Sequence, residues 1–122
     1  MCRFLALLCM VTAICGASLA HAAELIMFER SGCPYCVRWD EEIAPAYQRS
    51  EEAKVAPLRR YDIGKGQPKD VQLAVAVRFT PTFVLVDQGK EIGRITGYFD
   101  NAMFWGLLSK LLEQLPERKK TG

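Results

Sequence analysis

Short apolar runs along the chain predict four strands. The first run is apolar enough throughout to lie in the centre of a sheet. The second is interrupted by Arg59 and Arg60, and charges of this kind favour an edge strand because they discourage pairing with another sheet. The last two runs are joined by a short Asp-Gln-Gly-Lys turn, which predicts an antiparallel hairpin. The predicted strands are residues 24–29, 58–62, 81–86 and 91–96.

Three other stretches have the apolar spacing of helices. The first covers residues 34–49, and Pro45 should kink or interrupt it because proline removes an internal hydrogen bond. A short helix is predicted over residues 71–77. The closing helix follows a good N-cap, Asp100, and its apolar stripe, which runs from Met103 to Leu115, should cover one face of the sheet. Pro116 should end that helix, which leaves a polar tail over residues 117–122.

The first 22 residues have the pattern of a secretory signal peptide. Arg3 supplies a positive charge, a short apolar run follows, and Ala20-His21-Ala22 is a small-x-small cleavage motif. The apolar run is too short for a membrane-spanning helix. No small residue precedes Cys9 or Cys15, which argues against a lipid-anchored form. We therefore expect an exported protein that is cleaved before Ala23.

Cleavage there would change the chemistry that the chain can perform. The mature chain would have 122 − 22 = 100 residues and a net charge of +1 after the loss of one arginine from a total of +2, which indicates one small domain, residues 23–116. It would lose His21, the only histidine, and keep two cysteines, Cys33 and Cys36. Histidine ligands and Cys-His catalysis are then excluded. The small net charge gives no argument for nucleic acid or an anionic membrane as a partner.

The two remaining cysteines stand between the first predicted strand and the first predicted helix, as Cys33-Pro34-Tyr35-Cys36. A helix that begins at Cys33 would direct free backbone N–H groups and the positive end of its dipole at the Cys33 sulfur, which favours the thiolate. Pro34 suits the first turn, where a missing N–H costs nothing. We therefore predict that Cys33 is the nucleophile and that Cys36, one turn inside the helix and better buried, is the resolving thiol.

Three other interpretations of the cysteine pair compete with redox exchange. A structural zinc site needs four nitrogen or sulfur ligands, and the mature chain offers two, so no metal site is predicted. A structural disulfide would close a loop too small to constrain the unfolded chain much. A Cu(I) chaperone would use the two soft thiolates, but no methionine or histidine stands beside them. Redox exchange is the favoured interpretation.

The order of elements and two motifs together resemble the thioredoxin superfamily. Cys33-Pro34-Tyr35-Cys36 follows the first strand, and Thr80-Pro81 opens the third. The resemblance implies an α/β fold of compact, glutaredoxin-like form, with a four-stranded mixed sheet in the order 2-1-3-4, helices on both faces, and a cis proline beside the dithiol. In that position the Thr80 backbone can pair with an extended partner segment. We assign partner binding to Thr80, Pro81, Pro34 and Tyr35, the last two of which also tune the dithiol.

Two positions depart from the patterns of known subgroups. Cys-Pro-Tyr-Cys looks like the glutaredoxin motif, but residues 96–98 read Thr-Gly-Tyr where glutaredoxins usually have a Gly-Gly pair that approaches glutathione. A glutathione-linked glutaredoxin therefore stays an alternative. Thioredoxins place a buried aspartate below the dithiol, and the matching position here is Met27. Glu29, Lys54 or water could substitute for it.

The exported chain and its Ile-Thr-Gly-Tyr segment most resemble the SoxS-type periplasmic thioredoxins, which are encoded with bacterial thiosulfate-oxidation (Sox) systems. That resemblance implies a periplasmic monomer that reduces a disulfide or sulfur adduct on a partner protein, such as the cysteine-bearing Sox sulfur carrier. The cycle needs no bound cofactor, and a membrane thiol-relay protein would supply electrons. Proteins of this fold span reduction potentials from about −270 to about −120 mV, so a disulfide-forming oxidant or isomerase stays open.

Overall fold

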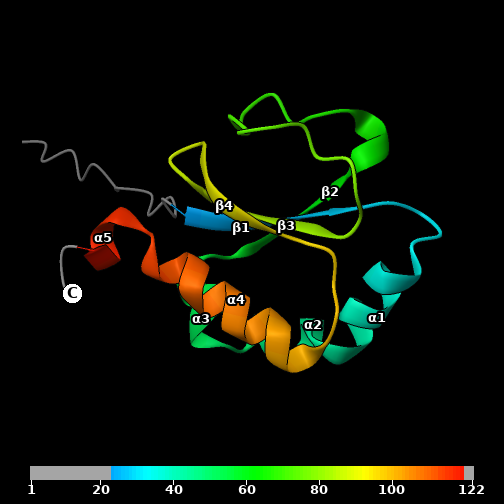
Figure 1. Cartoon of the computed structure of the whole chain (residues 1–122), viewed down its shortest axis with the longest axis horizontal. Coiled ribbons are helices and arrows are strands. Elements are labelled where there is room, and N and C mark those ends of the chain that lie inside the picture. Colours follow the sequence, from blue (N-terminus) through cyan, green and yellow to red (C-terminus); the bar gives the residue numbers. More distant parts are fainter. Residues whose placement is uncertain (1–22, 120–122) are drawn as a thin grey trace, which may run out of the picture.

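Residues 23–119 are described by a computed structural model, in which four strands form one mixed sheet (Figure 1). β1 (Ala23–Glu29) pairs in parallel with β2 (Leu58–Asp62) and antiparallel with β3 (Thr82–Asp87), which pairs antiparallel with β4 (Lys90–Thr96). The sheet order β2-β1-β3-β4 confirms the predicted order. All four predicted strands form, with ends within one residue of those expected.

β1 lies in the interior of the sheet, between β2 and β3, and both of its faces are covered. Its four successive side chains from Leu25 to Phe28 are fully buried. Side chains alternate along a strand, so Leu25 and Met27 join the larger core cluster, and Ile26 and Phe28 join a smaller cluster on the opposite face. A continuous apolar run is therefore what a central strand with two covered faces requires.

β2 forms an edge of the sheet, as its two arginines predict. Arg59 bridges to Glu24 of β1 at 3.1 Å and to Asp70 at 2.8 Å. The neighbouring Arg60 bridges to Glu29 of β1 and to Asp40. These guanidinium groups join the edge strand to its neighbours, and they place charge where another sheet would otherwise pair.

The first predicted helix is divided by the structure into three short ones. α1 (Pro34–Glu42) ends before Ile43, and α2 (Ala44–Gln48) begins after it. Pro45 causes this break, because its ring has no N–H and clashes with the preceding turn. The charged segment that follows forms α3 (Glu51–Val55), whose N-cap is the Ser50 hydroxyl, 3.1 Å from the backbone nitrogen of Ala53.

The closing helix, α4 (Asn101–Glu113), covers one face of the sheet, as its apolar stripe predicts. The Asp100 carboxylate caps it by accepting a 2.8 Å hydrogen bond from the Met103 backbone. The helix ends before Pro116, and the expected polar tail contains a further short helix, α5 (Pro116–Lys119). The buried positions of α4 are Phe104, Leu108, Leu111 and Leu112.

The helix predicted over residues 71–77 does not form, and this prediction is wrong. The segment is irregular, with bends and one isolated bridge, and the Gln72 backbone bonds both Gly89 and Glu91 of the β3–β4 hairpin, at 2.7 and 3.0 Å. The Gln67 side chain accepts a bond from the Val77 backbone at 3.1 Å. These partners satisfy backbone groups that a helix would otherwise pair internally, and valines have only modest helix propensity.

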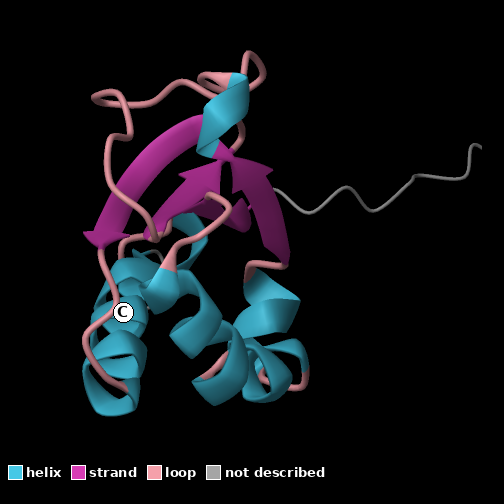
Figure 2. Ribbon diagram, turned by 90° about the vertical axis from the view of Figure 1, so that its right-hand side faces the viewer, coloured by secondary structure: helices cyan, strands magenta, loops and turns pink. Residues whose placement is uncertain are grey.

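The loss of that helix changes what covers the second face of the sheet. The α-helices of the described residues, α1 to α5, lie on one side of the sheet (Figure 2). The other side is covered by the 3₁₀ helix η1 (Ile63–Lys65) and by the irregular segment over residues 71–77, which contribute Ile63, Val71, Leu73 and Val77 to the smaller cluster. Helical structure is therefore present on both faces, but on the second face it is one short 3₁₀ helix and not an α-helix. Apolar side chains from a loop bury the face equally well.

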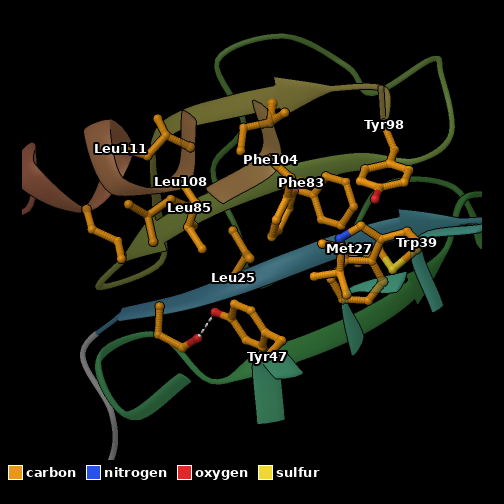
Figure 3. Close-up of a cluster of buried hydrophobic side chains, with 14 of the residues drawn as sticks. Leu25, Met27, Trp39, Tyr47, Phe83, Leu85, Tyr98, Phe104, Leu108 and Leu111 are labelled. Atoms are coloured by element: carbon orange, nitrogen blue, oxygen red, sulfur yellow. Dashed lines mark hydrogen bonds between the residues drawn. The ribbon is translucent and has the colours of Figure 1, made fainter. Parts of the chain in front are cut away.

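The larger core is centred on aromatic rings (Figure 3). Trp39 of α1 is fully buried, and its ring centroid lies 5.1 Å from that of Phe83 in β3 and 5.7 Å from that of Phe104 in α4. Phe83 and Phe104 are themselves 5.0 Å apart. This packing joins the helix that begins at the cysteines to both the sheet and the closing helix.

The signal-peptide prediction, residues 1–22, and the end of the polar tail, residues 120–122, lie outside the described residues. Between these two ends, no helix has the length and apolar character needed to cross a membrane.

Tyr47 supplies a test of the core that does not involve the cysteines. Its buried hydroxyl donates a 2.5 Å hydrogen bond to the backbone carbonyl of Ala56, which is also buried (Figure 3). We expect Tyr47→Phe to lower the free energy of unfolding by about 1–3 kcal/mol, because that carbonyl loses its partner. Urea denaturation measures this as a lower midpoint with an unchanged slope. Tyr61→Phe, on the opposite face, is the matched control, and an equal loss there would contradict the assignment.

Candidate functional site

The two cysteines form a disulfide at the start of α1. Cys33 is the N-cap of the helix and Cys36 lies in its first turn, with their Cα atoms 5.3 Å apart. The backbone N–H of Cys36 donates to the Cys33 sulfur, with a nitrogen–sulfur distance of 3.2 Å. The predicted contact between the helix N-terminus and the first sulfur is therefore present. The expectation that Cys36 is better buried is not met, because each residue is 4% exposed.

The Thr80–Pro81 peptide bond is cis, as the resemblance implied. The Pro81 carbonyl accepts a 2.7 Å hydrogen bond from the backbone of Gly97, which joins this turn to the end of β4. Gly97 has φ +85°, a conformation that side chains disfavour, so the connection depends on a glycine. Thr80 is half-buried, and its hydroxyl has no hydrogen-bond partner in residues 23–119.

The structure brings three of the predicted partner-binding residues to one groove, which has a volume of about 310 Å³. Tyr35, between the two cysteines, lines it together with Thr80 and Pro81. Pro34 is exposed and does not line the groove. The groove therefore lies beside the dithiol and connects the cysteine motif with the cis-proline turn.

Sequence reasoning missed most of the groove wall. The closing-helix residues Met103 and Leu107 were expected to cover the sheet, but they are 49% and 41% exposed and line the groove. Phe99, in the segment between β4 and α4, is 70% exposed there. The signal available in the sequence was the width of the apolar stripe on the closing helix. The stripe is wider than one face of the sheet can cover, so part of it must contact something else. The remaining wall residues are Ile95, Thr96, Gly97, Tyr98 and Phe104.

Tyr98 joins the groove wall to the helix that begins at the cysteines. Its hydroxyl donates to the carboxylate of Glu42 in the last turn of α1. Arg38, one turn earlier, pairs with Glu42 at 3.0 Å, and its guanidinium lies 5.4 Å from the centre of the Tyr98 ring. One side chain therefore holds the segment between β4 and α4 at a set position relative to α1.

The hydrogen bond between Tyr98 and Glu42 shifts the pKa values of both groups. Burial and the hydrogen bond to Glu42 raise the pKa of Tyr98 to about 12. The bond from Tyr98, followed by that from Arg38, lowers the pKa of Glu42 below its ordinary value. Since the Glu42 carboxylate is favoured by folding, its stabilising contribution is present above the ordinary carboxyl range and is lost as the pH falls through the lowered pKa.

The position below the dithiol carries no acid. Met27 is fully buried in the same core cluster as both cysteines. Glu29 is paired with Arg60, and Lys54 is paired with Glu51 on the exposed face of α3. Neither of these candidate substitutes hydrogen bonds to a cysteine. Within residues 23–119, no group of three or more histidine, cysteine or acidic side chains is arranged to hold a metal ion.

Comparison with known proteins identifies relatives of this arrangement. A family model described as a thioredoxin-like domain matches residues 16–112. No curated protein sequence matches the chain. The chain is similar to the periplasmic thioredoxin SoxS from Paracoccus pantotrophus, solved in its reduced form, with 44% identity and a TM-score of 0.73. That match covers 75% of this chain and 97% of the SoxS chain.

More distant solved structures share the fold. A thioredoxin-fold protein from Helicobacter pylori is 20% identical, with a TM-score of 0.56 and coverage of 84% of this chain and 87% of its own. Thioredoxin from Malassezia sympodialis is 16% identical, with a TM-score of 0.52 and coverage of 75% and 76%. The chain belongs to the thioredoxin-like family, and its redox-active Cys33–Cys36 pair makes it a thiol–disulfide oxidoreductase.

Proposed function

We propose that the protein reduces disulfides or sulfur adducts on partner proteins, with Cys33 as the nucleophile and Cys36 as the resolving thiol. The observation that carries this proposal is the hydrogen bond from the Cys36 backbone to the Cys33 sulfur. It gives the two thiols different surroundings although their exposure is equal. A sulfur that accepts an N–H at a helix N-terminus is stabilised as the thiolate, which is the attacking form.

The reaction is thiol–disulfide exchange in two steps. The Cys33 thiolate attacks one sulfur of the partner disulfide, which forms a Cys33–partner bond and releases the other partner sulfur as a thiolate. Cys36, deprotonated to its thiolate, then attacks the Cys33 sulfur and releases the partner's second thiolate. The partner gains two electrons and two protons, and the protein ends with the Cys33–Cys36 disulfide. No bound cofactor takes part.

Partner binding falls to the groove beside the motif. An extended segment that lies along it would pair with the Thr80 backbone, next to the cis bond, and contact Tyr35 and Pro81. Pro34 acts through the helix, because its fixed φ suits the first turn and holds Cys36 in place. The exposed apolar wall formed by Phe99, Met103 and Leu107 supports a partner segment with apolar side chains.

Similarity to a periplasmic thioredoxin supports the cellular setting. Residues 1–22 serve as the cleaved signal peptide, and residues 23–116 work in the periplasm as a monomeric domain that ends in a polar tail, 117–122. The partner is the cysteine-bearing carrier of a Sox sulfur-oxidation system, as the 44% identity with SoxS suggests. A membrane thiol-relay protein returns electrons to Cys33 and Cys36, and nucleic acid is not a partner.

Removing the resolving thiol tests the roles of the two cysteines. We expect Cys36→Ser to accumulate mixed disulfides with partner proteins, because nothing then displaces the captured partner from Cys33. Non-reducing electrophoresis of a periplasmic extract, with the adducts identified by mass, measures the trapped set, which should include the sulfur carrier. Cys33→Ser is the matched control and should trap nothing. An empty trapped set, together with tight Cu(I) binding by the reduced protein, would instead support a metal chaperone.

The direction of electron flow is tested with a protein whose disulfides are accessible. We expect the reduced protein to open those disulfides, and we expect its potential against glutathione to lie at the reducing end of the range for this fold, nearer to about −270 than to about −120 mV. A potential near the upper end, with rapid oxidation of reduced test protein, would contradict the reductase and identify a disulfide-forming oxidant.

Tyr98→Phe tests whether the groove wall contributes to partner reduction. The change keeps the ring and removes the hydroxyl that joins the wall to Glu42. We expect the rate of protein disulfide reduction at low substrate to fall about three- to tenfold, the range of one hydrogen bond, while reduction of a small disulfide is unchanged. Tyr47→Phe removes a buried hydroxyl that does not line the groove, and it should leave the ratio of the two rates as in the wild type. Equal losses on both substrates would contradict the assignment.

A further inference from the structure

A second hollow, of about 470 Å³, lies on the opposite face of the sheet from the groove. Its floor contains Thr82, Arg94 and Thr96, which alternate with Phe83 and Ile95 of the larger core, so these side chains point away from the α-helices. Thr96 lines both the groove and the hollow. The two therefore meet at the end of β4.

The walls of the hollow are held by polar contacts. The Arg94 guanidinium donates a 2.7 Å hydrogen bond to the Val75 carbonyl, and the Thr82 hydroxyl donates a 2.7 Å bond to the Phe79 carbonyl. These bonds fix the segment that precedes the cis-proline turn, although its side chains are not buried. Val75 is 65% exposed and Phe79 is 69% exposed. The shape of the hollow is therefore present before anything binds.

Exposed apolar surface is concentrated around these two features. Seven large apolar side chains of the described residues are exposed, and six of them line either the groove or the hollow. Scattered exposed side chains would need no explanation, but a concentration on both sides of one turn marks a contact surface. The six are Tyr35, Phe99, Met103 and Leu107 in the groove and Val75 and Phe79 in the hollow.

Charge at the hollow indicates what it binds. Arg94 is neutralised by Glu91, with contacts of 2.8 and 2.6 Å. Arg78 also lines the hollow, is exposed, and forms no ion pair with any residue in 23–119. An apolar surface with an unpaired cation at its rim complements an apolar side chain that is followed by a carboxylate.

We propose that this hollow, formed by Val75, Arg78 and Phe79, is a second binding site for the partner segment whose disulfide Cys33 attacks, and that it selects an apolar residue next to an acidic one. The inference rests on the proposed function, since the occupant is the disulfide partner. A chain that lies in the groove and crosses the turn enters the hollow next, because Thr96 borders both.

The test uses the mature chain, residues 23–122, with Cys36→Ser, in which Cys33 is the remaining cysteine, and cysteine peptides whose sulfur carries thionitrobenzoate. Attack by Cys33 forms the protein–peptide disulfide and releases coloured thionitrobenzoate, so the rate is read directly. Each peptide is a Gly-Ser chain with a Phe-Asp, Phe-Lys or Ser-Asp pair, placed before the cysteine in one version and after it in another. Cysteine alone, with the same leaving group, measures the intrinsic reactivity of Cys33.

We expect the Phe-Asp peptide, in one of its two placements, to react about two- to fivefold faster than Phe-Lys, which is the range for one exposed ion pair. Arg78→Glu should reverse that order. Arg49→Glu changes the net charge equally at an exposed position outside both hollow and groove, and it should leave the order unchanged. Phe79→Ser should slow the Phe-Asp peptide about tenfold and the Ser-Asp peptide little. Cysteine alone should react at one rate with all variants.

Several results would overturn this inference. Equal rates for Phe-Asp and Phe-Lys, or a reversal by Arg49→Glu as large as that by Arg78→Glu, would show that the hollow does not select the peptide. Concentration-dependent dimers that Phe79→Ser abolishes in sedimentation would show that the occupant is a second copy of the chain. A protein that forms no disulfide with any probe would contradict the proposed function itself, whereas one that reacts equally with all of them would contradict this inference alone.

Discussion

The packing of Trp39 against Phe83 and Phe104 is the contact on which the site depends. Each ring comes from a segment that builds the site: Trp39 from the helix that begins at Cys33, Phe83 from the strand after the cis-proline turn, and Phe104 from the closing helix. Tyr98, from the loop between β4 and α4, joins the same cluster, 6.4 Å from Phe104. Segments far apart in the chain are thus positioned by one aromatic cluster, because rings in a close-packed core resist displacement.

The sulfur chemistry is arranged through backbone groups. Met27 is buried at the position below the dithiol where thioredoxins have an acid, and the two side chains considered as substitutes, Glu29 and Lys54, form ion pairs with other residues. The donor that does reach Cys33 is the Cys36 backbone N–H. A backbone donor keeps its proton at any pH at which the protein is folded, so the contact with Cys33 does not depend on the ionisation of a neighbour.

The two faces of the sheet serve different purposes. Helices cover one face and leave an apolar groove between the closing helix and the cysteine motif. An irregular segment covers the other, and it is held to β4 by Arg94 and to β3 by Thr82. That segment continues into the cis-proline turn, so the contacts that close the second core also position the turn beside the dithiol. The same segment therefore buries the second core and places the cis-proline turn at the site.

The sequence by itself determined the strands, the sheet order through its resemblance, the cap at Asp100, and the cysteine motif at the head of a helix. These depend on short-range patterns such as apolar runs, turn residues and Cys-x-x-Cys spacing. Only the tertiary structure decided that residues 71–77 form no helix, because the hydrogen-bond partners of Gln72 come from a hairpin later in the chain. It also decided that Met103 and Leu107 line a groove, since helical periodicity shows that a face is apolar but not what lies opposite it.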